Sequence, residues 1–123
     1  KPNLAELRQM VSNPQASLED QIQELRQLGA QHVLVSMGAE GSVLFAADGS
    51  VYRQLPLSGE MISTVGAGDS MVAGFLASLE NPSASFEESL RWAAACGTAT
   101  AFSRGIAQRK QVEALLKQIQ IEK

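Results

Sequence analysis

The residues best suited to chemistry lie in the stretch STVGAGDS, residues 63–70, directly ahead of the apolar stretch MVAGFLASL. Gly66 and Gly68 lack a Cβ atom, so the backbone can adopt positive φ and a ligand can approach the main chain. Consecutive N–H groups at the start of a helix, together with the helix dipole, attract an anion. No lysine adjoins the stretch. We therefore predict a phosphate site built from main-chain amides without a formal cation.

Asp69 is an unexpected neighbour for such a site, because a carboxylate repels a phosphate. A carboxylate that faces an acceptor hydroxyl instead would orient it and accept its proton, while the amides stabilise the charge of a phosphoryl group in transfer. The alternative is structural, since an acidic residue in the first turn of a helix complements the dipole and glycines make turns. Spacing alone favours the structural interpretation.

Other motifs fail on the residues present. A Walker A loop needs a Gly-Lys pair, which is absent. A dinucleotide fingerprint needs a glycine where Met71 stands, and a nucleophile elbow needs one where Val72 stands. His32 and Cys96 are the only residues of their types and lie far apart in the sequence, which disfavours a zinc site and a Cys–His nucleophile. We expect His32 to be solvated.

Composition excludes several classes of protein. The chain has 123 residues, is 45% hydrophobic and 19% charged, and carries a formal net charge of −3, which is typical of one globular domain. No basic cluster indicates a nucleic-acid partner, and no apolar run is long enough to predict a membrane span. The single cysteine excludes an intrachain disulfide and favours a reducing compartment, so we expect a cytoplasmic protein.

The elements that position the glycine stretch alternate between helical and extended patterns. Apolar spacing predicts helices over 3–11, 17–29, 68–80, 85–103 and 108–121. Apolar runs predict a strand over 32–37, covered on both faces, and two strands within 42–56 joined by the turn Asp48-Gly49. This order predicts an α/β domain with a central sheet flanked by helices. So few strands need a sheet begun elsewhere, and the chain does not open with Met, so we expect a piece of a larger protein.

Three motifs in this sequence resemble those of the ribokinase-like, phosphofructokinase-B-type sugar kinases. TVGAGDS ahead of a small-residue helix resembles their C-terminal signature. KPNLAE resembles their N-x-x-E element at Asn3 and Glu6, and VSMGAEG resembles a strand followed by a G-x-x-G turn at Gly38 and Gly41. The motifs occur in the family's order and nearly span the chain. The resemblance implies a three-layer ribokinase-like sandwich, of which residues 1–123 form the C-terminal nucleotide-binding and catalytic-base region.

The resemblance also implies a role for each matching position. Asp69 would be the catalytic base, and the amides of Gly66, Ala67 and Gly68 would form the anion hole. The positions on the ATP side would be Lys1, Asn3, Glu6, Ser36, Gly38, Gly41 and Thr64. Asn3 and Glu6 match the pair that organises magnesium through its waters. Backbone oxygens of Ser63 and Val65 match those that hold a monovalent cation, potassium, in several members, and residues 95–105 match a wall of the adenine pocket.

Several of these positions also have a structural explanation. Asn3 with Glu6 forms a near capping box at a helix start. Gly38 and Gly41 fit an ordinary turn. The small residues within 93–101 are typical of closely packed helices, and Cys96 is expected to pack in the core.

The expected function is phosphoryl transfer from ATP, with Mg2+, to a hydroxyl of a phosphorylated hexose. The motifs are most similar to the hexose-phosphate branch, with fructose 1-phosphate the favoured acceptor and tagatose 6-phosphate or fructose 6-phosphate the alternatives. Residues 1–123 contain no match to the family's sugar-binding segment or lid, so these residues alone are expected to transfer nothing. The resemblance further implies a homodimer of the full-length protein. A nucleoside or vitamin kinase of the same fold and a non-catalytic nucleotide-binding module stay open, although Asp69 argues against the latter.

Overall fold

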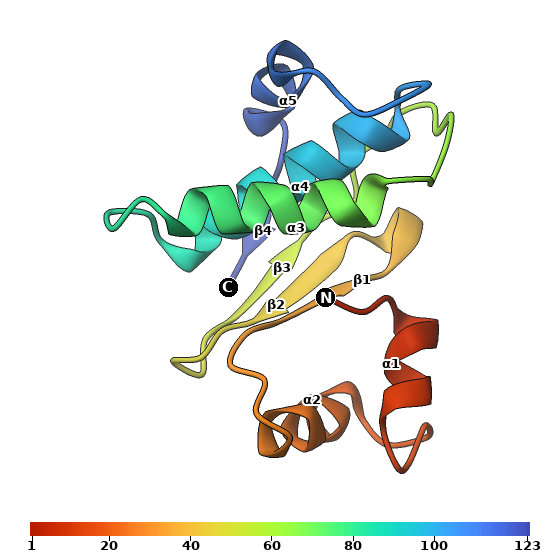
Figure 1. Ribbon diagram of the computed structural model, residues 1–123, viewed down its shortest axis with the longest axis vertical. Coiled ribbons are helices and arrows are strands. Elements are labelled where there is room, and N and C mark those ends of the chain that lie inside the picture. The colour runs from red at the N-terminus through yellow and green to blue at the C-terminus, as the bar shows by residue number, and fades with distance from the viewer.

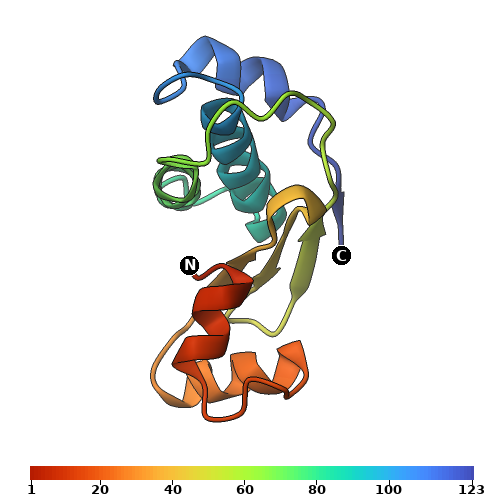
Figure 2. The same ribbon diagram turned by 90° about the vertical axis from the view of Figure 1, so that its right-hand side faces the viewer.

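The computed structural model describes residues 1–123 and arranges them in layers around one sheet (Figure 1). The elements in chain order are α1 (Leu4–Met10), α2 (Leu18–Gln27), β1 (Val33–Ser36), the short 3-10 helix η1 (Gly38–Glu40), β2 (Ser42–Phe45), β3 (Val51–Gln54), α3 (Ala67–Leu79), α4 (Phe86–Ala101), α5 (Arg109–Leu116) and β4 (Ile121–Glu122). The helices α1 and α2 cover one face of the sheet, while α3 and α4 cover the other (Figures 1 and 2). The predicted three-layer α/β sandwich is confirmed.

The sheet has the strand order β1-β2-β3-β4, and every neighbouring pair is antiparallel. The predicted hairpin is confirmed, with Leu44 opposite Tyr52 and a turn in which Gly49 has φ 90°. The Ser50 N–H donates to Asp48 Oδ1 at 2.9 Å, and hydrogen bonds from Ser50 hold the pKa of Asp48 below its usual value. The turn chemistry therefore determines the register of the hairpin.

Alternate residues of β1 and β2 face opposite layers, as the period of a strand requires. Val33, Val35 and Val43 pack against α1 and α2, whereas Leu34 and Leu44 pack against α3 and α4. All five side chains are at most 5% exposed, so the prediction that this part of the sheet is covered on both faces is confirmed.

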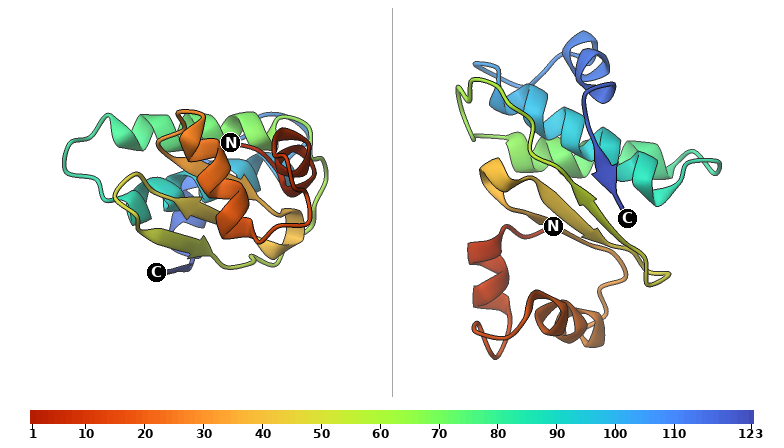
Figure 3. Two further views of the ribbon diagram at one scale, coloured as in Figure 1. Left: turned by 90° about the horizontal axis from the view of Figure 1, so that it is seen from below. Right: turned by 180° about the vertical axis from the view of Figure 1, so that it is seen from behind.

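The predicted closing helix over 108–121 is wrong in its last third. Helix α5 ends at Leu116, and Ile121 pairs with Gln54 as part of β4 (Figure 3, right). Ile119 is 4% exposed and packs in the cluster beneath α4 and α5, and the Gln120 carbonyl accepts from the Leu55 N–H at 2.9 Å. The extended conformation of this segment buries Ile119 and supplies hydrogen-bond partners to the edge of β3, which would otherwise be unpaired.

Helices α3 and α4 pack closely because small residues face each other between them. A Cβ atom on Gly74 would lie 2.8 Å from the Trp92 carbonyl oxygen and 2.7 Å from Cys96 Sγ. A Cβ atom on Gly97 would collide with Met71. The prediction that the small residues of 93–101 serve helix packing is confirmed. None of the helices has both the length and the apolar character that a membrane crossing demands.

Candidate functional site

The N-terminus of α3 begins at the predicted glycine stretch. Gly66 is the N-cap in a left-handed conformation, with φ 81°, and no side chain caps the helix. The Ala67 N–H donates to Thr64 O at 3.3 Å, and the Ser70 N–H donates to Gly66 O at 2.9 Å. The N–H groups of Gly66, Gly68 and Asp69 have no acceptor within the chain. The amides are therefore available to an anion at Gly66 and Gly68, as predicted, whereas the third predicted donor, the Ala67 N–H, already has an acceptor in Thr64 O.

A lysine lies at this helix start, so the prediction of an anion site without a formal cation is wrong. Lys1 Nζ lies 3.1 Å from the point that a Cβ atom of Gly68 would occupy, and it donates to Ser36 Oγ at 3.3 Å. The segment of Lys1 is held beside β1, because the Ser36 N–H donates to Pro2 O at 3.1 Å. The ammonium group adds a positive charge to that of the helix dipole.

Most of the predicted site residues line one cleft of about 560 Å³. They are Lys1, Asn3, Glu6, Ser36, Gly38, Gly41, Thr64, Ala67 and Gly68. They come from the segment before α1, the β1–β2 connection and the start of α3, which the sheet brings together. The structure thus gathers three motifs that are far apart in the sequence.

The remaining predicted residues lie beside this cleft or outside its lining. Gly66 and Asp69 flank the lining residues Ala67 and Gly68. Asp69 is exposed, accepts no hydrogen bond within the chain and is in neither of the ion pairs, which join Arg91 to Glu87 and Arg109 to Glu113. Its carboxylate therefore has no partner in the chain that would hold it away from an incoming ligand.

Ser63 and Val65, the predicted cation positions, do not line the cleft. Val65 is 84% exposed, and its N–H donates to Ser63 Oγ at 3.1 Å. Neither backbone carbonyl accepts a hydrogen bond within the chain. Both oxygens are therefore available to a ligand.

Asn3 and Glu6 form the capping box that the sequence offered as their structural explanation. Asn3 Oδ1 accepts from the Glu6 N–H at 2.8 Å, and Glu6 Oε2 accepts from the Asn3 N–H at 2.9 Å. Both residues also line the cleft. The box orients the carboxylate and leaves Glu6 Oε1 without a hydrogen bond, so this oxygen can accept from water on a magnesium ion. The two explanations are compatible.

The turn between β1 and β2 depends on its glycines. Gly38 has φ 58° and Gly41 has φ 94°. A Cβ atom on Gly41 would collide with the Gln54 carbonyl oxygen of β3. Gln54 itself is 5% exposed, accepts from Ser42 Oγ at 3.0 Å and borders the cleft. The turn therefore approaches the neighbouring strand closely, and only glycine permits that approach.

The far wall of the cleft comes from α4 and the loop before α3. Gly97, Thr98, Ala101 and Phe102 line it, all within the segment predicted to border adenine. Sequence reasoning missed the other lining residues, which are Ala39, Gln54, Pro56, Leu57, Gly59, Met61, Met71 and Ala94. Gly59 is required by packing, because a Cβ atom there would collide with the Phe102 ring, but only the tertiary structure shows this contact.

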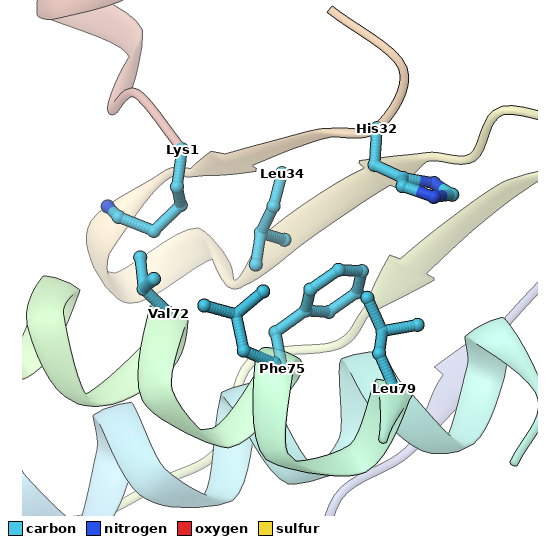
Figure 4. A pocket seen from close by; sticks show the side chains of 7 residues that line it. Lys1, His32, Leu34, Val72, Phe75 and Leu79 are labelled. Carbon is cyan, nitrogen blue, oxygen red and sulfur yellow. The ribbon is translucent and has the colours of Figure 1, made fainter. Parts of the chain in front are cut away.

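The prediction that His32 is solvated is wrong. Its side chain is half-buried, Nδ1 accepts from the Ala47 N–H at 3.1 Å, and its ring lies 4.9 Å from that of Phe86. His32 borders a second hollow of about 270 Å³ between β1 and α3, where Phe75 and Leu79 point toward the strand (Figure 4). This hollow is mainly apolar and shares only Lys1 with the predicted site.

Cys96 is half-buried between α3 and α4, and burial raises the pKa of its thiol. A raised pKa leaves little thiolate at neutral pH, so a packing role fits this residue better than a nucleophilic one.

Acceptor-free amides, a lysine and a fixed carboxylate surround one cleft of a three-layer α/β sandwich. This combination is typical of an anion-binding cleft in a protein of the α/β class. The chain belongs to the pfkB family of carbohydrate kinases, which it matches over residues 1–112.

Known proteins resemble the chain in sequence and in fold. It is 36% identical over 124 residues to 1-phosphofructokinase of Bacillus subtilis (strain 168), covering 98% of this chain and 40% of that protein. It is 35% identical over 125 residues to D-tagatose-1-phosphate kinase of Bacillus licheniformis, and the match covers 98% of this chain and 40% of that protein. It superimposes on a crystal structure of phosphofructokinase-2 from Escherichia coli in complex with potassium, with a TM-score of 0.83, 28% identity and coverage of 95% and 39%. It also superimposes on a structure of Arabidopsis thaliana ribokinase with a TM-score of 0.81 and 31% identity, over 94% of this chain and 39% of that one, so the fold is ribokinase-like. The chain spans about 40% of the length of the curated relatives it matches.

Proposed function

We propose that the protein containing this chain transfers the γ-phosphoryl group of ATP to a hydroxyl of a phosphorylated hexose, with fructose 1-phosphate as the favoured acceptor. The observation that carries this proposal is the exposed, unpaired carboxylate of Asp69 among acceptor-free amides at the edge of the cleft. Relatives named as kinases of a fructose phosphate and of a tagatose 1-phosphate support the acceptor class. Residues 1–123 then supply the nucleotide half of the site and the base.

The nucleotide would lie along the cleft with its phosphates at the start of α3. Lys1 Nζ and the amides of Gly66 and Gly68 would contact the phosphate oxygens. The turn at Gly38 and Gly41 would approach the nucleotide through its main chain, and the wall of Gly97–Phe102 would border the adenine. A bound magnesium ion, its waters held by Asn3 and Glu6, would neutralise phosphate charge.

Asp69 would act on the acceptor and not on the nucleotide. Its carboxylate would accept the proton of the attacking hydroxyl as the new oxygen–phosphorus bond forms and the bond to the ADP oxygen breaks. The amides beside it would stabilise the charge on the oxygens of the group in transfer. Placing the base next to the amides aligns the attacking oxygen with the phosphorus, which supplies much of the rate enhancement in phosphoryl transfer.

A monovalent cation would be held by the carbonyl oxygens of Ser63 and Val65, which lie directly before the glycine turn. The potassium complex of a structural neighbour supports this assignment. A cation held there would supply positive charge near the start of α3.

The test is Asp69→Asn in the complete protein, assayed with fructose 1-phosphate, tagatose 1-phosphate, tagatose 6-phosphate, fructose 6-phosphate and a nucleoside as acceptors. We expect kcat for the preferred acceptor to fall by roughly a thousandfold while the KM for ATP changes by less than about twofold, because general-base catalysis typically contributes about 10²–10⁴. Fructose 1-phosphate is expected to give the highest kcat/KM.

Asp20→Asn is the matched control, because Asp20 is also an exposed acid in the first turn of a helix. It is expected to leave kcat unchanged. If Asp69→Asn retained more than about a tenth of the wild-type kcat, Asp69 would be a dipole partner only. Transfer to none of these acceptors by the wild-type protein would contradict the proposed activity itself.

A further inference from the structure

Thr100, near the C-terminal end of α4, contacts the first turn of α3, which follows Gly66. Thr100 is 1% exposed, and its Oγ1 lies 2.8 Å from Ser70 Oγ in the first turn of α3. The same oxygen accepts from the Ala107 N–H at 3.2 Å. A buried hydroxyl with partners in two different segments holds those segments in place, because a buried polar group seldom gives up its hydrogen bonds.

Thr100 also contacts the other end of the first turn. Its Cγ2 lies 3.8 Å from the point that a Cβ atom of Gly66 would occupy, so the methyl group packs against the left-handed cap. The turn itself is closed by the Ser70 N–H, which donates to Gly66 O at 2.9 Å. Thr100 therefore supports both Gly66 and Ser70, and Asp69 lies between them.

The next residue of α4 fixes the segment that leads into the turn. The Ala101 carbonyl accepts from the Ile62 N–H at 2.8 Å and from the Ser63 N–H at 3.1 Å. Beyond it, Val65 is exposed and its N–H bonds only to Ser63 Oγ. Within residues 64–70, the Ser70–Thr100 contact is the only side-chain hydrogen bond that reaches another element.

We propose that Thr100 is a positioning residue for phosphoryl transfer, acting by holding the first turn of α3 so that Asp69 and the amides face the reacting groups together. This inference rests on the proposed function. Thr100 does not line the cleft, so it contacts neither nucleotide nor acceptor and acts only through Ser70 and Gly66. A displacement of the turn by about 1 Å is enough to cost about a hundredfold in rate.

The same two helices provide a matched control at their other ends. Ser89 of α4 is fully buried, and its Oγ donates to Ser78 Oγ of α3 at 3.1 Å. This contact also joins a hydroxyl of α4 to a hydroxyl of α3, but neither serine borders the cleft. A merely structural role for Thr100 predicts that losing either contact has the same consequences.

The experiment uses the complete protein with Thr100→Val, Thr100→Ser and Ser89→Ala. Valine keeps the shape of threonine and removes the hydroxyl. We expect Thr100→Val to lower kcat by at least about tenfold with the KM for ATP within about twofold, because the turn acts mainly in the transition state. Thr100→Ser is expected to restore kcat to within about twofold, and Ser89→Ala is expected to lower Tm without changing kcat. Equal kcat values for Thr100→Val and Ser89→Ala would overturn the proposal.

A second readout needs no catalysis. Amide hydrogen exchange of residues 66–70 in the substrate-free protein should be faster in Thr100→Val than in wild type and unchanged in Ser89→Ala. Unchanged exchange in Thr100→Val would refute the positioning role even if the protein transferred no phosphoryl group, so that failure is distinguishable from failure of the proposed function. If Thr100→Val did not fold, Ser70→Ala carries the same test from the other partner, and an unchanged kcat in that variant would refute the role.

Discussion

Helices α3 and α4 lie side by side on one face of the sheet, but their N-termini differ. Ser85 caps α4, and its Oγ accepts from the Glu88 N–H at 3.1 Å. Helices α1 and α2 are capped in the same way by Asn3 and Ser17. Helix α3 begins at Gly66, which has no side chain to offer. Unlike the starts of α1, α2 and α4, the start of α3 therefore leaves its first N–H groups without a capping side chain, and these groups are available to a ligand.

The acidic residues in the first turns of α3 and α4 also differ, because one has an ion-pair partner and the other has none. Glu87 of α4 is paired with Arg91 at 2.9 Å, on the surface and one helical turn away. Asp69 of α3 has no such partner. A surface pair of this kind contributes little stability, so the pairing of Glu87 is ordinary, while the isolation of Asp69 leaves its carboxylate available.

Among the changes that compare the two helices, the largest loss of stability is expected at the contact between α3 and α4. Gly74→Ala places a methyl group 2.8 Å from the Trp92 carbonyl oxygen, and a backbone atom cannot move aside cheaply. We expect the free energy of unfolding of the complete protein to fall by about 2–3 kcal/mol in urea denaturation, despite the better helix propensity of alanine. Gly105→Ala, which adds a methyl group in open space, is the control and should leave stability nearly unchanged. A Gly74→Ala protein as stable as wild type would show that α3 and α4 can separate freely.

The next effect tests the uncapped start itself. Gly66→Ala forces a residue with a Cβ atom into a left-handed conformation, at a cost of about 1–2 kcal/mol. Because the amides and Asp69 then change direction, we also expect kcat to fall by at least about tenfold in a steady-state assay. Gly29→Ala imposes similar strain at the end of α2, where φ is 108° and nothing crowds the Cβ position. The Gly29→Ala variant should lose stability and keep its kcat. If both variants lost kcat, the loss in Gly66→Ala would be explained by backbone strain and not by the position of Gly66 at the site.

The smallest effect is expected at the capped start. Ser85→Ala removes the N-cap of α4 and should lower the free energy of unfolding by about 1 kcal/mol. Turnover should stay at the wild-type value, because no ligand replaces the cap there. Ser85→Asp retains an acceptor and should restore most of the stability. A loss of turnover in Ser85→Ala without a loss in Ser85→Asp would mean that α4 transmits its N-terminal cap to the site, and the contrast between the two helices would fail.

Much of the fold and of the candidate site was predictable from local patterns. The hairpin at Asp48-Gly49, the capping box of Asn3 and Glu6 and the glycine turn before α3 all appear where the sequence indicates them. Each depends on residues within about four positions of one another, where capping, turn formation and helical spacing operate. The family resemblance, and not these local patterns, implied the nine predicted residues that line the cleft.

The positions that the sequence left undetermined are those decided by distant contacts. Lys1 reaches Gly68 only because Ser36 holds its segment beside β1 while α3 packs on the same sheet. Ile121 has a helical pattern around it, yet it extends because the edge of β3 offers a partner. His32 is half-buried because the rings of Phe75 and Phe86, which belong to helices packed on the sheet, lie against it.

By itself, the sequence determined the local chemistry of this protein: which helices cap themselves, which turn needs glycine and which carboxylate begins α3. Only the tertiary structure decided that a lysine stands at the open helix start, that Thr100 supports it from beneath and that a fourth strand closes the sheet edge. The physical reason is that packing and burial join residues without regard to their separation along the chain, whereas capping and periodicity act between near neighbours.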